Sequence, residues 1–385
     1  MKKKILTFAS YVLVAMLATV TTLAIVSSQG SLTPSKLEQL ESLIQEKFIG
    51  EADLTEIEDA AAEAMVDALG DRWSYYIPAD EYETHMEQMN NAYVGVGITI
   101  QAAEDDEGFQ IMAVTAGGPA EEAGLLVDDL VVEAAGQDVR DMTSSDVRNL
   151  VRGEEGTYVS ITVLRMGDVH TFSVERRKIE TPVASYRMLE NNVGLVTIEN
   201  FDSRCAEESI AAIETLLEAG AEKLIFDVRN NPGGYASELV KLLDYLLPEG
   251  ELFRAVSYTG QEDIDYSDES CLDMPMVVLA NVNSYSAAEF FAAAMREYEA
   301  ATVVGEQTCG KGYFQSTFRL SDGSAVGLSI GKYYTPKGNS LADAGITPDV
   351  HVIVDEETAS AIYYGQLEPD DDPQIQAALK VLEKE

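Results

Sequence analysis

Ser286 and Lys311 are the two residues whose types and spacing point to covalent chemistry. Ser286 stands within Asn281-Val-Asn-Ser-Tyr-Ser-Ala-Ala-Glu289, and Lys311 follows 25 residues later between Gly310 and Gly312. A serine hydroxyl becomes a useful nucleophile when a neighbouring base accepts its proton, and a lysine amine does so once it is neutral. The pair therefore predicts a serine nucleophile with a lysine base.

Lys311 needs a special environment for this role. Lowering a lysine pKa from near 10.4 to about 7–8 takes roughly 4 kcal/mol. The formal net charge of −41 favours the ammonium form, so local desolvation must outweigh it, and we expect Tyr313 and Phe314 to form apolar walls. A lysine beside two glycines is more often a solvated loop residue, and this interpretation stays open.

Ser286 also begins the pattern Ser286-Ala-Ala-Glu289, which is typical of a capping box. Taken alone, it indicates a helix that starts near Ala287, after a buried strand over Met276–Ala280. A helix start also favours negative charge that develops beside it. The cap and the nucleophile therefore predict the same local structure.

Two further motifs belong beside this pair. Asn230-Asn-Pro-Gly-Gly234 follows a buried strand, and its Gly233 or Gly234 N–H is a candidate for an oxyanion hole together with the Ala287 N–H; a plain strand-to-helix turn is the alternative. Gln315 shares strand parity with Lys311, but an unbroken strand would hold their Cα atoms about 13 Å apart. Close approach of Gln315 would need a bend at one of the neighbouring glycines.

Composition excludes several other classes of function. The acidity of the 385-residue chain argues against binding to nucleic acid. The three histidines lie in no motif-like setting, and the three cysteines form no CxxC pair. We expect the cysteines to be free thiols, although one disulfide between two of them is an open alternative. We expect neither a metal nor a nucleotide cofactor. The acidic runs 104–107, 262–269 and 370–372 are expected to be solvated loops.

The N-terminus predicts a membrane anchor. Three lysines precede an uncharged run over residues 5–26, which as a helix would be about 33 Å long and would span a bilayer. The lysines should stay cytoplasmic, so the rest of the chain would lie on the extracytoplasmic side. A cleaved signal, giving a secreted protein, is the alternative, and a buried soluble helix is a third.

The remaining patterns predict an α/β multidomain fold. Residues 1–30 form the cytoplasmic stub and anchor, 31–90 a helical segment with an aromatic turn at 71–78, 91–177 a domain of short strands, 178–365 an α/β core and 366–385 a C-terminal helix. The order of elements in 91–177 resembles a PDZ domain, specifically the circularly permuted kind of secreted bacterial proteases. Its carboxylate-binding loop would be Tyr93, Val94, Gly95, Val96, Gly97 and Ile98.

PDZ domains of this kind usually have a glycine where this chain has Asp128. Aspartate tolerates a left-handed backbone better than most residues, so we expect this turn to survive.

Taken together, these motifs resemble the carboxyl-terminal processing, or tail-specific, serine proteases. The resemblance covers nearly everything after the anchor and rests on these segments: Asp71-Arg-Trp-Ser-Tyr-Tyr, the PDZ segment, Asp227-Val-Arg-Asn-Asn-Pro-Gly-Gly234, Asn281-x4-Ser286-Ala-x-Glu289, Gly305-Glu-x-Thr-x-Gly-Lys311-Gly and Gly345-Ile-Thr-Pro-Asp349. It implies a Ser286–Lys311–Gln315 arrangement in which the glutamine orients the lysine, and an oxyanion hole made by Gly233 and Ala287. Tyr285 departs from the family, where alanine is usual, and its bulk would narrow the substrate pocket.

The resemblance implies a membrane-anchored serine endopeptidase that captures protein C-terminal tails through its PDZ domain. Arg152, at the end of the PDZ helix, is a candidate for coupling capture to cleavage, or it is only a surface charge. Self-association into a homo-oligomer is left open. Two alternatives remain: a PDZ scaffold on an inactive core, and a thiol enzyme that uses Cys309.

Overall fold

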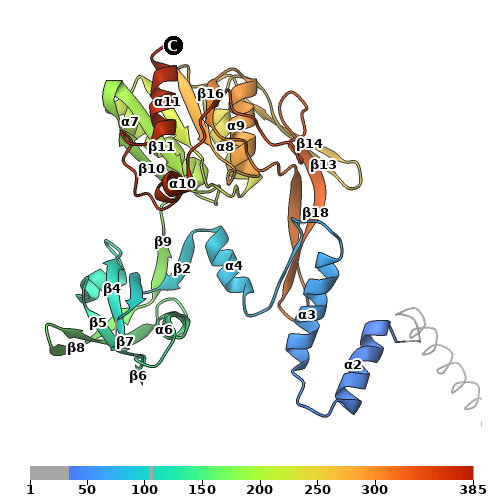
Figure 1. The fold of residues 1–385 in the computed structure, drawn as a ribbon, viewed down its shortest axis with the longest axis vertical. Coiled ribbons are helices and arrows are strands. Elements are labelled where there is room, and N and C mark those ends of the chain that lie inside the picture. Colours follow the sequence, from blue (N-terminus) through green and yellow to red (C-terminus); the bar gives the residue numbers. More distant parts are fainter. Residues whose placement is uncertain (1–33, 104–106, 385) are drawn as a thin grey trace, which may run out of the picture. The chain divides into compact units, whose positions relative to one another are not determined.

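The computed structural model describes residues 34–103 and 107–384, which belong to two compact units with their boundary after Gly70 (Figure 1). The predicted anchor, residues 1–30, lies outside the described residues. Among the helices within the described ranges, none is long and apolar enough to cross a membrane.

The first unit contains the helices α2 (Lys36–Lys47) and α3 (Leu54–Asp67). α2 starts with a capping box between Ser35 and Glu38, and α3 starts at Asp53, whose carboxylate accepts two N–H groups of the first turn. Several large apolar side chains of this unit are exposed, including Leu37, Leu40, Leu43, Phe48 and Met65.

The second unit begins with two elements that precede the PDZ domain. β1 (Tyr75–Ile77) pairs antiparallel with residues 325–327 of β18 (Ala325–Tyr334). The aromatic turn predicted over residues 71–78 is therefore confined to its first part, at residues 72–73, and the rest of that prediction was wrong. α4 (Tyr82–Met89) follows, and then β2 (Ala92–Gly95) pairs with β9 (Arg177–Glu180) to form a two-stranded ribbon. The ribbon is the entry and exit of the PDZ domain.

The PDZ domain is a sheet with the strand order β3-β4-β5-β7-β8, closed by two short helices. Its elements are β3 (Ile98–Ala102), β4 (Phe109–Val114), α5 (Pro119–Ala123), β5 (Leu130–Ala134), β6 (Gln137–Asp138), α6 (Ser144–Val151), β7 (Tyr158–Arg165) and β8 (Asp168–Glu175). Asp128 adopts φ 72° as expected, and its carboxylate accepts the Gln110 Nε2–H. Buried Asp129 forms an ion pair with Arg165 at 2.7 Å.

A sheet with the order β10-β11-β12-β15-β16-β19 forms the α/β core. Its strands are β10 (Ala184–Met188), β11 (Val193–Ile198), β12 (Lys223–Asp227), β15 (Met276–Ala280), β16 (Ala301–Gly305) and β19 (Val350–His351). Only β10 pairs antiparallel with its neighbour. The central strands are buried on both faces, which explains their continuous apolar runs.

Helices cover both faces of this sheet (Figure 1). α7 (Cys205–Glu218), α8 (Ala236–Leu246) and α9 (Ala287–Glu297) pack on one face, and α11 (Pro373–Leu382) packs on the other. Buried Arg229 also holds α11 in place, because it donates to Asp227 at the end of β12 and to Asp372 and Gln374 at the start of α11. α10 (Glu356–Tyr363) precedes α11.

A second sheet of the core contains β1, β18, β13 (Gly250–Ser257), β14 (Glu262–Ser267) and β17 (Tyr313–Arg319). The predicted hairpin of β17 and β18 is confirmed. The acidic run at 262–269 was predicted to be a loop, but most of it is the edge strand β14. Most of its charged side chains are exposed. Charged residues are common on edge strands, which pair with a neighbour on only one side.

Candidate active site

Ser286 lies where the loop after β15 enters α9, as the sequence predicts. Its backbone has φ 58° and ψ −125°, a conformation that is costly for any residue other than glycine. The preceding loop is fixed by the Ser284 hydroxyl, which donates to the Val228 carbonyl at 2.7 Å, and by the Tyr285 N–H, which donates to the Asn231 carbonyl. The strained turn at Ser286 is therefore held by its surroundings.

The predicted capping box at Ser286 is wrong. The Ser286 side chain makes no cap hydrogen bond to α9, because its backbone conformation is not the extended one that a capping residue needs. The Glu289 side chain does not reach back to Ser286 but faces the loop before Lys311. The hydroxyl of Ser286 thus stays available for another role.

Glu289 is a fully buried carboxylate that holds the loop carrying Lys311. It accepts hydrogen bonds from the Thr308 hydroxyl, the Gly310 N–H at 2.7 Å and the Lys311 N–H at 2.9 Å. Burial raises the pKa of Glu289, and the three donors oppose that rise. Sequence reasoning placed Glu289 in a cap, so its link between α9 and the lysine loop was missed.

The Lys311 amine lies against two aromatic rings. Its Nζ is 4.8 Å from the centroid of the Trp73 ring and 5.9 Å from that of Tyr285. Burial lowers the pKa of Lys311 to about 8, while Cys309 and Asp71 act in the opposite direction. The expected desolvation is present, but the rings contacting the amine are not those of Tyr313 and Phe314, which the sequence suggested.

The Tyr333 hydroxyl contacts both Ser286 and the backbone of Lys311. This buried hydroxyl donates to the Lys311 carbonyl oxygen and interacts with the Ser286 side chain. Within the described parts of the chain, no hydrogen bond joins Ser286 Oγ directly to Lys311 Nζ. Tyr333 comes from β18, and nothing in its sequence pattern distinguished it from an ordinary core residue.

Gln315 lies on β17 next to a break in the register between Phe314 and Gln315. Its amide donates to the Tyr313 carbonyl and to the Ser329 hydroxyl at 3.0 Å. Neither bond involves Lys311, so the predicted orienting role of Gln315 stays a prediction.

Gly233 packs directly against the start of α9. A Cβ atom added to Gly233 would come within 2.7 Å of both Ser286 Cβ and Ala287 N, so only glycine fits this position. The Gly233 N–H donates to Asn231 Oδ1 at 2.8 Å. The assignment of Gly233 and Ala287 to an oxyanion hole stays a prediction, and for Gly233 it requires this bond to be released.

The candidate peptide-binding residues fall into two places. Tyr93, Val94 and Gly95 belong to β2 of the ribbon, whereas Val96, Gly97 and Ile98 lead into β3 of the PDZ sheet. Arg152 is paired with Glu87 of α4 at 2.6 Å, and its guanidinium lies 5.1 Å from the centroid of the Tyr93 ring. Arg152 therefore links the PDZ helix to α4 and to the ribbon.

All three cysteines, Cys205, Cys271 and Cys309, are free thiols in the structure. Cys309 accepts a hydrogen bond from Arg72 Nη2 at 2.9 Å. Burial raises the pKa of Cys205 to about 12, which makes that thiol unreactive.

The environment of Lys311 predicts the pH dependence of peptide cleavage. We expect kcat/KM to rise with pH through an apparent pKa of about 8, because only the neutral amine accepts a proton. Trp73→Ala admits water to the amine and should move the profile to higher pH, whereas Asp71→Asn removes a negative charge and should move it to lower pH. Profiles that fail to move in opposite directions would contradict this account.

Glu289→Gln tests the link between α9 and the lysine loop. It replaces an acceptor oxygen with an NH2 group that faces N–H donors, so we expect a loss of about 1–3 kcal/mol in the free energy of unfolding for each buried group left unpaired. We also expect kcat to fall about 100-fold, because Lys311 is no longer held in place.

Glu297→Gln is the matched control for Glu289→Gln. Glu297 also lies on α9 and also accepts three donors, from Thr335, Lys337 and Asn339, but these come from a different loop. Urea unfolding should show a loss of stability in both variants, and kinetics should show the loss of kcat only in Glu289→Gln. An equal loss of kcat in both would reject a specific role for Glu289.

Comparisons with known proteins agree with this architecture. The model of peptidase family S41 matches residues 192–361, and that of a PDZ domain matches residues 110–165. A carboxyl-terminal-processing protease of Synechocystis sp. is 32% identical over 331 residues, which are 84% of this chain and 76% of the relative. A probable CtpA-like serine protease of Staphylococcus saprophyticus is 31% identical over 82% of this chain, which spans only 64% of that relative's length.

The crystal structure of a putative S41 protease from Bacteroides fragilis shares the fold, with a TM-score of 0.53 at 15% identity, covering 92% of this chain and 99% of that chain. This chain belongs to peptidase family S41, the carboxyl-terminal-processing serine proteases with a PDZ domain.

Proposed function

We propose that this chain is an endopeptidase that captures the C-terminal tail of a protein in its PDZ domain and cleaves it with Ser286 and Lys311. The observation that carries the proposal is the environment of Lys311, whose amine lies against two aromatic rings and whose pKa is lowered to about 8. Such a lysine supplies a neutral amine near physiological pH, which is what a serine nucleophile without a histidine requires.

The proposed reaction is acyl transfer in two steps. The Ser286 oxygen attacks the peptide carbonyl carbon, and its proton passes to the Lys311 amine. The negative charge on the carbonyl oxygen is stabilised by backbone N–H groups at Ala287 and at the Gly233–Gly234 turn. The Lys311 ammonium then protonates the leaving amine, and a water molecule, deprotonated by Lys311, releases the acyl group from Ser286.

Several contacts of the described arrangement must change before this reaction. Ser286 interacts with Tyr333, Gln315 donates to Ser329, and the Gly233 N–H donates to Asn231. We assign this arrangement to a resting form, and in the active form the Lys311 amine turns toward Ser286. Gln315 would then orient Lys311 from β17.

The exposed edge of the PDZ sheet supports the proposed capture of the tail. β3 is an edge strand with α6 beside it, so a peptide can pair with β3 while its terminal carboxylate meets the N–H groups of residues 96–98. Arg152 is the proposed link from this groove to the rest of the enzyme, because it connects α6 to α4 through Glu87.

The proposed location is the extracytoplasmic side of the cell membrane, with residues 1–30 as the anchor and secretion after cleavage as the alternative. Mass spectrometry of the mature N-terminus separates the two. We expect residues 1–30 to be retained, and a mature protein that begins between Ala24 and Ser31 would contradict the anchor.

Cleavage of a reporter peptide with a free C-terminus tests the catalytic assignment. We expect Ser286→Ala to abolish turnover and Lys311→Ala to lower kcat about 10²- to 10⁴-fold. Amidation of the reporter's C-terminus should raise KM with little change in kcat, because it removes the carboxylate that the PDZ domain binds.

Equal turnover by the wild type and both variants would reject the proposed mechanism. Turnover that survives in Ser286→Ala but is lost after alkylation of thiols would favour a Cys309 enzyme. The absence of turnover with every reporter, combined with retained binding of the free tail, would favour a PDZ scaffold.

A further inference from the structure

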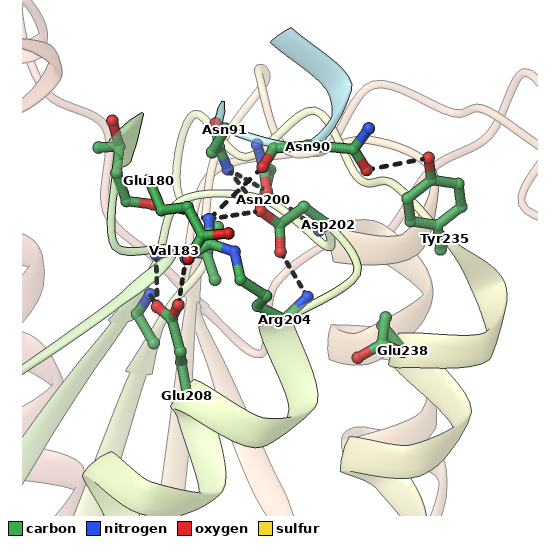
Figure 2. A network of polar contacts seen from close by, with 12 residues as sticks. Asn90, Asn91, Glu180, Val183, Asn200, Asp202, Arg204, Glu208, Tyr235 and Glu238 are labelled. Carbon is green, nitrogen blue, oxygen red and sulfur yellow. Dashed lines mark hydrogen bonds and ion pairs between the residues drawn. The ribbon is translucent and has the colours of Figure 1, made fainter. Parts of the chain in front are cut away.

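The ribbon that carries the PDZ domain is attached to the core by a continuous polar network (Figure 2). The network joins both ends of the ribbon, near residues 90–91 and 180–183, to the loop between β11 and α7 and to the first turn of α7. Its side chains come from elements that lie far apart in the sequence. Neither the proposed catalytic steps nor the binding of the tail uses any of them.

Asn91 connects the two strands of the ribbon with the loop. Its side-chain amide donates to Asn200 Oδ1 at 2.8 Å and to Asp202 Oδ2 at 3.3 Å, and its carbonyl accepts the Thr181 N–H at 2.9 Å. Its backbone is left-handed, with φ 43°, so a glycine could replace it without changing the path of the chain.

Arg204 is the centre of the network. Its Nη2 donates to the Thr181 carbonyl at 2.8 Å and to Asp202 Oδ2 at 2.9 Å, and its Nη1 pairs with Glu208. Asp202 is fully buried, so loss of Arg204 would remove the cationic partner of a buried carboxylate. Glu208 in turn accepts the Val183 N–H at 2.7 Å. This bond links the network to the segment that follows β9, where the chain leaves the PDZ domain.

The same loop also forms hydrogen bonds with the candidate oxyanion turn, which is the turn at Gly233 and Gly234. Phe201 donates its N–H to the Gly233 carbonyl at 2.8 Å and accepts the Tyr235 N–H at 2.7 Å. The two bonds flank the peptide between Gly233 and Gly234 and fix the orientation of its plane, which places the Gly234 N–H on the side opposite Phe201. A Cβ on Gly234 would lie 2.2 Å from the Phe201 oxygen, so no side chain fits between them.

A second contact reaches this turn from the ribbon side. The Tyr235 hydroxyl donates to Asn90 Oδ1 at 3.3 Å, as Figure 2 shows. Tyr235 directly follows Gly234 and precedes α8, so the turn is connected to the ribbon both through Phe201 and through Tyr235. The turn itself packs against Ser286, as the contact of Gly233 shows.

We propose that Asn91 and Arg204 are positioning residues that fix the orientation of the oxyanion turn. Through them, this orientation depends on where the ribbon lies on the core. Neither residue touches the substrate. Each acts through the loop around Phe201, which orients the Gly233–Gly234 peptide beside Ser286. This inference rests on the proposed function, because it assigns the turn a part in stabilising the negative charge.

Asn91→Gly and Arg204→Lys test the proposal, with Asn191→Gly as the matched control. Asn191 is also left-handed, with φ 59°, but lies exposed in the turn before β11. We expect Asn91→Gly to lower kcat about 10- to 100-fold while KM for a reporter with a free tail stays within about twofold. Arg204→Lys should lower kcat less than Arg204→Ala does, because lysine keeps the positive charge beside Asp202.

Hydrogen exchange of residues 231–236 gives a readout that does not depend on catalysis. We expect this segment to exchange faster in Asn91→Gly than in the wild type or in Asn191→Gly. An unchanged kcat together with unchanged exchange in Asn91→Gly and Arg204→Lys would overturn the proposal, as would equal effects in Asn191→Gly.

The two proposals fail in distinguishable ways. If the wild type does not cleave, or Ser286→Ala still does, the proposed function fails, and the exchange of residues 231–236 alone decides whether the ribbon controls the turn. If the wild type cleaves through Ser286 but neither kcat nor exchange responds to Asn91→Gly, only the positioning role is lost.

Discussion

The buried carboxylate of Glu289 is the constraint on which the candidate site depends. It lies one turn after Ser286 on α9, about 4.5 Å along the helix axis, and it accepts three donors from the loop that ends at Lys311. Burying a carboxylate without hydrogen-bond donors costs free energy of folding. The loop must therefore keep its donors at Glu289, and the position of Glu289 on α9 determines where the loop lies. The loop that ends at Lys311 is thereby tied to α9 through one side chain rather than through the intervening residues.

The Lys311 amine is subject to opposing influences. Burial favours the neutral amine, whereas the charge of Asp71 and the face of the Trp73 ring favour the ammonium ion. The net charge of −41 acts in the same direction as Asp71. Burial prevails because Trp73 and Tyr285 cover the amine while most of the acidic side chains lie at the solvent-exposed surface. Tyr285, which departs from the family pattern, thus contributes to the environment of the Lys311 amine.

The sequence was sufficient to predict features with strong local patterns. The buried strands of the core, the hairpin of β17 and β18, the helix after Ser286 and the left-handed Asp128 all depend on nearby residues. The assignment of Ser286 and Lys311 to one catalytic site came from the family resemblance and stays a prediction.

Features that depend on distant partners could not be predicted in the same way. Glu289 matches a capping box, but its partners are 19 to 22 residues away and Ser286 cannot adopt the capping conformation. Tyr75–Ile77 becomes a strand only because β18 lies beside it, roughly 250 residues later. The polar network around Arg204 likewise joins segments near residues 90–91, 181–183, 200–208 and 235, which no local pattern connects.

The most direct test of the central assignment is the location of the acyl group during turnover. The enzyme would be mixed with a peptide ester at pH 8.5, quenched with acid within the first turnover, digested and analysed by mass spectrometry. The account predicts an acyl group on Ser286 that forms in the wild type, accumulates more slowly in Lys311→Ala and is absent from Ser286→Ala. An acyl group on Cys309, or acylation that persists in Ser286→Ala, would contradict it.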